Sequence, residues 1–143
     1  MRLEELSKTG TLRKVKPNKQ LIETALKKAH RDLRVSTTLI QQEEYDWAYT
    51  ASYTAMPTAA RALMNHTGYR PPSSDGHTAV VRILEAEEID QDIRNLTIID
   101  RMRRTRHRVM YDEYDIITEK TAKQAHTWAN KFVTTIEKPI NKT

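Results

Sequence analysis

Apolar residues recur along much of this chain at steps of three and four, which places them on one face of an α-helix. The most regular stripe predicts a helix over residues 18–42, with one serine among the apolar side chains of its buried face. The members of this face are Ile22, Leu26, Ala29, Leu33, Ser36 and Ile40. Because the spacing continues without a break, we expect this helix to form one wall of an antiparallel bundle.

A second helix is predicted over residues 45–65, and its inner face consists of alanines that allow another helix to approach closely. These alanines are Ala48, Ala51, Ala55, Ala59 and Ala62. Trp47, Tyr49, Tyr53 and Leu63 are expected to fill the space beside them. Pro57 lies inside the pattern and lacks a backbone donor, so it predicts a kink or, alternatively, a break.

Further helical patterns follow a loop at residues 69–74, which begins after Gly68. Asp75 is expected to cap a short helix that carries Val80, Val81 and Leu84. A fourth helix is predicted over residues 89–113, with Ile89, Ile93, Leu96 and Ile99 on its apolar face. A fifth should begin at Thr118 and end at Pro139. With no strand-like alternation of useful length, the sequence predicts an all-α protein, an up-and-down bundle of four to five helices.

The bundle domain is expected over residues 17–143, preceded at 1–16 by a basic, loosely ordered N-terminal arm with a helical turn near residues 3–6. The formal net charge of the chain is +5, and residues 1–40 hold ten Lys and Arg against four Asp and Glu. A basic protein is attracted to polyanions without sequence specificity. Residues 8–19 are therefore either a solvated tail or a source of additional phosphate contacts.

Composition excludes several classes of protein. The chain has no cysteine, which rules out disulfides and thiolate metal ligands. We expect no metal and no cofactor, because no two histidines are spaced at i, i+4 beside a carboxylate and no glycine-rich phosphate loop or nucleophile elbow is present. No apolar run reaches the roughly 20 residues that span a bilayer, and the first ten residues lack the core of a secretion signal. We therefore expect a cytoplasmic protein without a membrane partner.

The segment richest in candidate chemistry is residues 101–108, RMRRTRHR, which holds five arginines and one histidine and has acid-rich sequence on both sides. Arginine presents a planar fork that matches phosphate or carboxylate. The block, which we call the arginine block, is therefore either a surface for a polyanion or a salt-bridged helix face.

Helical phasing divides the arginine block between two faces. Arg94, Arg101 and Arg108 share one side and are expected to face solvent. Arg106 instead projects from the flank of the apolar seam, where a guanidinium needs an acidic neighbour or a ligand. His107 shares its side with Tyr111 and is either a packed histidine or part of a site.

Three segments together resemble the HEPN-domain family. Residues 45–63, YDWAYTASYTAMPTAARAL, are similar to the family's YxxAYYAMFHAARALL segment. Gly68, Tyr69, Arg70 and Pro71, with His77 after them, resemble its KGYRPKSHHA connector, and residues 106–111, RHRVMY, resemble its arginine-plus-polar motif. The resemblance covers about residues 18–137.

This resemblance implies a bundle of four or five helices, usually a homodimer, from prokaryotic toxin–antitoxin and defence loci, and many members are encoded beside a small nucleotidyltransferase. Active members cut RNA without metal through an R-x(4–6)-H motif from each subunit, which meet at the dimer interface. It implies that Arg106 contacts phosphate, that His107 is the general acid or base and that Tyr111 is a supporting donor, while Arg103, Arg104 and Arg108 bind nucleic acid. These residue types suit 2′-hydroxyl attack on phosphorus.

The sequence departs from the family motif after Arg106, because no histidine follows within four to seven positions and Met110 and Tyr111 stand there instead. Arg101 and His107 do satisfy R-x(5)-H, which makes Arg101 the fallback for the catalytic arginine. Two functions stay open. The chain is either a metal-independent endoribonuclease or a non-catalytic member whose arginine cleft binds a nucleotide or a nucleotidyltransferase partner.

Overall fold

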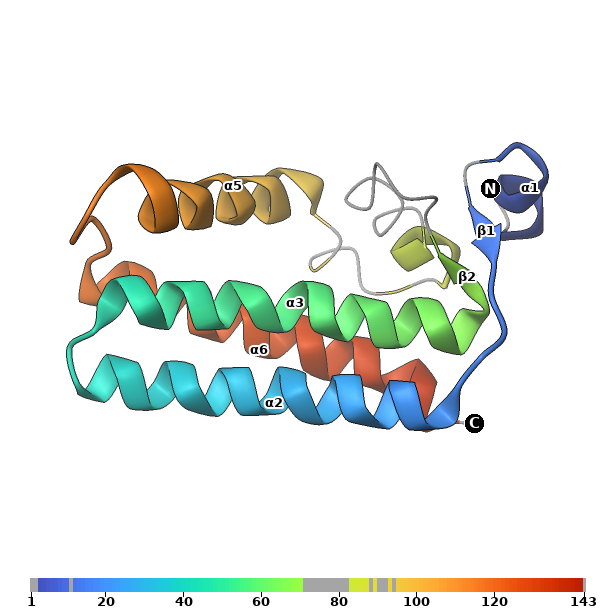
Figure 1. The fold of residues 1–143 in the computed structure, drawn as a ribbon, viewed down its shortest axis with the longest axis horizontal. Helices are drawn as coiled ribbons and strands as arrows, with labels where there is room; N and C mark the ends of the chain where they lie inside the picture. Colours follow the sequence, from blue (N-terminus) through green and yellow to red (C-terminus); the bar gives the residue numbers. More distant parts are fainter. Residues whose placement is uncertain are drawn as a thin grey trace.

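The computed structural model describes residues 3–10, 12–70, 83–87, 89, 93 and 95–142. Its described elements are α1 (Leu3–Lys8), β1 (Arg13–Lys14), α2 (Lys19–Gln41), α3 (Tyr45–Thr67), β2 (Tyr69–Arg70), α5 (Leu96–His107), η1 (Arg108–Asp112) and α6 (Glu119–Asn141). Figure 1 shows that α2, α3 and α6 pack side by side, while α5 lies along α3. The helices α2, α3, α5 and α6 alternate in direction in chain order, so α2 is antiparallel to α3 and to α6, and α3 and α6 run the same way. This arrangement confirms the prediction of an all-α bundle.

The two N-terminal long helices have the predicted extents. Asn18 begins α2 by accepting a hydrogen bond on its side chain from the amide of Leu21 at 3.2 Å. The buried residues of α2 are Ile22, Ala25, Ala29, Leu33 and Ser36. Leu26 and Ile40 are only partly buried, because the buried face passes over Ala25 instead.

The alanine face of α3 is also largely as expected, since Ala48, Ala55, Ala59 and Ala62 are fully buried. Tyr49 and Leu63 pack beside this face and Tyr53 is half-buried. The expectation for Trp47 is wrong, because 56% of its surface is exposed. It lies in the first turn of α3, about 100° around the helix from Ala48 and so away from the buried face.

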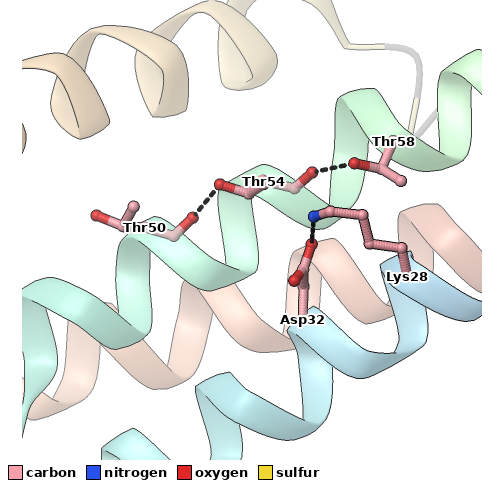
Figure 2. Close-up of polar contacts among 5 residues, drawn as sticks. All are labelled: Lys28, Asp32, Thr50, Thr54 and Thr58. Carbon is pink, nitrogen blue, oxygen red and sulfur yellow. Dashed lines mark hydrogen bonds and ion pairs between the residues drawn. The ribbon is translucent and has the colours of Figure 1, made fainter. Parts of the chain in front are cut away.

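Pro57 does not break α3, which is continuous from Tyr45 to Thr67. Because proline has no N–H, the carbonyl of Tyr53 loses the donor that a regular helix would supply. Threonine hydroxyls donate to nearby carbonyls on both sides of this position, Thr54 to Thr50 at 2.8 Å and Thr58 to Thr54 at 3.0 Å. Figure 2 shows these threonines in a row along α3. Bonds of this kind tend to bend a helix rather than interrupt it.

The prediction for the fourth helix is wrong at its start. The helix begins at Leu96 and not at residue 89, because the side chain of Asn95 accepts from the amide of Ile98 at 3.2 Å and so caps its N-terminus. Ile89 and Ile93 are buried as expected, but both precede the helix. The last predicted helix begins after its Thr118 cap, as expected.

Pro139 was expected to end α6, yet the helix continues to Asn141. Since only two helical residues follow it, the missing amide of Pro139 removes one bond of the last turn and leaves the rest of the helix intact.

The N-terminal segment, expected as a loosely ordered arm, contains α1, β1 and two buried leucines, Leu6 and Leu12. β1 pairs antiparallel with β2, with Arg13 opposite Arg70. Gly68 ends α3 with φ of +83°, and its carbonyl accepts from the amide of Val15 at 2.8 Å.

Part of the predicted connector lies outside the described residues, namely Asp75, His77, Val80 and Val81. Arg94 lies outside them too, so its expected place beside Arg101 and Arg108 stays a prediction. Residues 83–86 are helical, and Leu84 is fully buried.

Candidate functional site

The arginine block occupies the second half of α5 and the first residue of η1, and three of its arginines are paired with acids. Asp100 contacts Arg103 at 2.9 Å and Arg104 at 3.4 Å, one helical turn away. Arg108 contacts Glu113 at 3.0 Å. These pairs are largely exposed, so each contributes little to stability. They show that much of the block is a salt-bridged helix surface.

Arg106 differs from these three. It is half-buried, and its Nε is buried without a hydrogen-bond partner among the described residues. This agrees with the flank position expected from helical phasing. Arg101 is exposed and likewise makes no ion pair within the described part of the chain. Because an unsatisfied buried donor is costly, Arg106 is the member of the block that most needs a ligand or a partner.

Two tyrosines of α3 lie against the arginines of α5. Burial raises the pKa of Tyr53, and the positive charges of Arg103 and Arg106 oppose that rise. Burial also raises the pKa of Tyr49, while a hydrogen bond with Thr105 and the charge of Arg101 oppose it. The arginines therefore face a seam that holds polar phenols, which sequence reasoning had placed only as filling beside the alanines.

His107 is exposed, and its ring lies against that of Tyr111, with centroids 4.9 Å apart and planes at 47°. Tyr111 is itself 67% exposed and belongs to η1, a π-helical turn in which the amide of Glu113 donates to the carbonyl of Arg108 at 2.9 Å. Single π-helical turns occur often at functional sites. The structure therefore brings together two of the predicted site residues.

The structure does not bring His107 together with either candidate for the catalytic arginine. Arg106 and His107 are consecutive on α5, so their side chains leave the helix about 100° apart. Arg101 and His107 are six residues apart and also project in different directions. Within one chain, Arg106 and Arg101, the two candidates for the catalytic arginine, thus do not share the side of α5 that carries His107.

No group of three or more metal-ligating side chains occurs among the described residues. Within the same residues, every helix is too short or too polar to cross a membrane.

A comparison with models of protein families matches the HEPN domain over residues 22–139, which is most of the chain. This chain belongs to the HEPN domain family. A search of curated proteins finds no match to it. The matched range begins in α2 and ends in α6, so it includes the three long helices, α5 and η1, while α1 and β1 precede it.

In this HEPN domain the arginine block lies on α5 and the first residue of η1, and α5 is the helix that runs along the alanine-rich α3. A salt-bridged helix face was one of the two predictions for the block, but Asp100 was not identified as the acid that pairs with Arg103 and Arg104. The i, i+3 and i, i+4 spacings were the available signal for it.

Proposed function

We propose that this HEPN-domain protein binds RNA through an arginine-lined cleft between two subunits and cleaves it without a metal, as one component of a prokaryotic toxin–antitoxin or defence module that acts in the cytoplasm. The observation that carries the proposal is the half-buried guanidinium of Arg106, whose Nε has no partner among the described residues. A phosphate oxygen supplies the missing acceptor when the Arg106 side chain turns outward to meet it.

The other arginines of the arginine block also support RNA phosphate as the ligand. Arg101 is exposed, and Arg103, Arg104 and Arg108 pair with acids that are themselves partly exposed. Such surface pairs exchange readily for contacts with RNA phosphates, because their net energy is small in water.

The proposed chemistry is transfer of the phosphodiester to the neighbouring 2′-hydroxyl. His107 takes the proton of the attacking 2′-hydroxyl as the bond from the 2′-oxygen to phosphorus forms. The bond from phosphorus to the 5′-oxygen breaks and that oxygen takes a proton from water, giving a cyclic phosphate and a 5′-hydroxyl. Arg106 stabilises the charge that develops on the phosphorane oxygens. Tyr111 helps to hold the His107 ring through their tilted ring contact.

This mechanism needs two subunits. In one chain Arg106 and His107 leave α5 in different directions, so a dimer with facing α5–η1 surfaces is required to place His107 of one subunit near Arg106 of the other. Arg101 is the alternative arginine, because it stands six residues before His107.

The second candidate function is non-catalytic. It is favoured by the pairing of three block arginines with Asp100 and Glu113 and by the contact of His107 with Tyr111 rather than with an arginine. In this case the arginine block binds a nucleotide or the acidic surface of a nucleotidyltransferase partner.

The test is incubation of the purified protein with an end-labelled structured RNA in the presence of EDTA. We expect cleavage that falls by about 10²–10³-fold in Arg106→Ala and by about 10²–10⁴-fold in His107→Ala. The matched control is Arg34→Ala, an exposed arginine of α2, which should cleave as the wild type does. Absence of cleavage, together with stable binding of a co-expressed nucleotidyltransferase that Arg106→Ala weakens, would establish the second function instead.

A further inference from the structure

A cavity of about 540 Å³ lies on the face of α3 that carries Tyr53, Pro57 and Ala60. Its other walls come from Val15 just after β1, from β2, from Ile99 and Arg103 of α5, and from single residues of α2 and α6. The cavity extends from Arg70 of β2 along α3 to Arg103 of α5, which lies one helical turn before His107. Figure 1 shows that β2 and the end of α5 lie at opposite ends of the bundle. Its lining residues are Val15, Leu21, Tyr53, Met56, Pro57, Ala60, Arg61, Met64, Asn65, Arg70, Ile99, Arg103 and Phe132.

Most of this lining is apolar. Met56, Ile99 and Phe132 are buried members of the core that also reach the cavity. Methionine side chains adapt their shape to different ligands, and a chamber of this volume is typical of small-molecule sites. The walls therefore suit an organic body of modest size rather than a bare ion.

The polar groups of the cavity are mainly cationic. Arg61, Arg70 and Arg103 come from α3, β2 and α5 and line the same space. Arg103 is already paired with Asp100. Arg61 and Arg70 are exposed and have no acidic partner among the described residues, and no acidic side chain is among the described lining residues. The two guanidiniums thus favour an anion.

Two further polar groups face the same space. The side-chain oxygen of Asn65 accepts from the amide of Asn18 at 2.6 Å, which leaves the NH₂ group of Asn65 to donate elsewhere. The carbonyl of Tyr53 lacks its usual helical donor because of Pro57, and both residues line the cavity. The site therefore offers donors near its arginines and one acceptor in its wall.

We propose that this cavity binds a small amphiphilic organic anion, whose apolar body fills the chamber between Met56, Ile99 and Phe132 and whose carboxylate or phosphate is held by Arg61 and Arg70. The site goes beyond the proposed RNA function: it shares Arg103 with the arginine block, but Arg106, His107 and Tyr111 do not line it. A carboxylate on an aliphatic chain and a nucleoside monophosphate share this chemistry, so the experiment distinguishes them.

The probe is 1-anilinonaphthalene-8-sulfonate, an aromatic anion whose fluorescence rises in apolar surroundings, titrated onto the full-length folded protein. We expect saturable binding that decanoate or AMP displaces. Displacement by decanoate alone identifies an aliphatic carboxylate as the natural class, and displacement by AMP alone identifies a nucleoside phosphate. Binding of the probe that neither anion displaces would overturn the proposal.

Variants test the two halves of the site separately. Arg61→Gln/Arg70→Gln should weaken probe binding by about ten-fold or more, because each charge-assisted hydrogen bond is a strong one. Met64→Trp keeps the arginines and should abolish binding by filling the chamber. Arg34→Gln on α2 is the matched control and should bind as the wild type does. Circular dichroism confirms that each variant is folded, and a double variant that binds like the wild type contradicts the assignment.

Discussion

The hydroxyl oxygens of Ser36 and Ser52 lie 2.6 Å apart and join α2 to α3 inside the core, where both side chains are fully buried. Ser36 Oγ also donates to the carbonyl of Ala48 at 3.0 Å. Since a serine hydroxyl has one hydrogen, the hydrogen between the two serines comes from Ser52. The one polar residue of the α2 stripe therefore has its partner on the alanine-rich helix.

We expect Ser36→Ala and Ser52→Ala each to lower the free energy of unfolding by about 1 kcal/mol, because each leaves a buried hydroxyl or its partner less well satisfied. The double variant should lose less than the two singles together, by about 0.5–1 kcal/mol. Urea denaturation of the four proteins measures this coupling. Strictly additive losses would show that the short contact contributes no stability.

The two N-terminal long helices and the start of α6 were predicted correctly from local sequence. The extents of α2 and α3 follow from their apolar spacing, and the Asn18 and Thr118 caps follow from side chains that bond three residues ahead. The start of α5 was missed because Ile89 and Ile93 continue the helical spacing although they are buried outside the helix. Apolar spacing predicts that a residue is buried, but it does not show whether that residue belongs to a helix or to the segment before it.

The candidate site was predictable only in part, for a similar reason. The arginine block and its phasing are sequence properties, and the flank position of Arg106 agrees with its half-burial. Its missing partner depends on which side chains α3 presents to α5, a contact between residues about 50 apart. The cavity could not be foreseen at all, because Arg61, Arg70 and Arg103 meet only through the packing of α3, β2 and α5.

Burial lowers the pKa of His126 from its ordinary value of 6.5. Its Nε2 lies 3.2 Å from the carbonyl of Leu33, to which a neutral ring donates. Below that ordinary value the unfolded chain binds a proton that the folded chain resists, so stability should fall as the pH decreases below about 6.5. Tm measured from pH 8 to pH 5 should drop less in His126→Gln than in the wild type. An equal fall of Tm in the two proteins would show that His126 does not cause the loss.

Asp100 holds two arginines of the block, so its removal should release them for RNA. We expect Asp100→Asn to bind RNA several-fold more tightly and with a steeper salt dependence, by about one or two additional phosphate contacts. Filter binding across a salt series measures both the affinity for RNA and its salt dependence. The control is Asp32→Asn, which removes the same charge from a pair with Lys28 at 2.9 Å on α2 (Figure 2). Equal gains in the two variants would point to net charge and not to the arginine block.

Asp46 anchors the connection between η1 and α6 to the first turn of α3. Its two carboxylate oxygens accept from the amides of Asp115 at 2.7 Å and Ile117 at 3.0 Å. Asp115 has φ of +54°, a conformation that its non-glycine backbone adopts at some cost and that this anchor helps to hold. The carboxylate also lies at the positive end of the α3 dipole.

Asp46→Ala should therefore lower the free energy of unfolding by about 1.5–3 kcal/mol, because it removes two hydrogen bonds to a charged acceptor. Asp46→Asn retains one carbonyl oxygen as an acceptor, so its free energy of unfolding should lie between those of the wild type and Asp46→Ala. Glu44→Ala is the control, since this neighbouring acid precedes α3 without a side-chain cap bond. Hydrogen exchange should also quicken at Asp115 and Ile117 in Asp46→Ala alone. Because the anchored connection follows directly after η1, the same variant should loosen Tyr111 against His107, and unchanged exchange at η1 would show that the π-helical turn is held independently of Asp46.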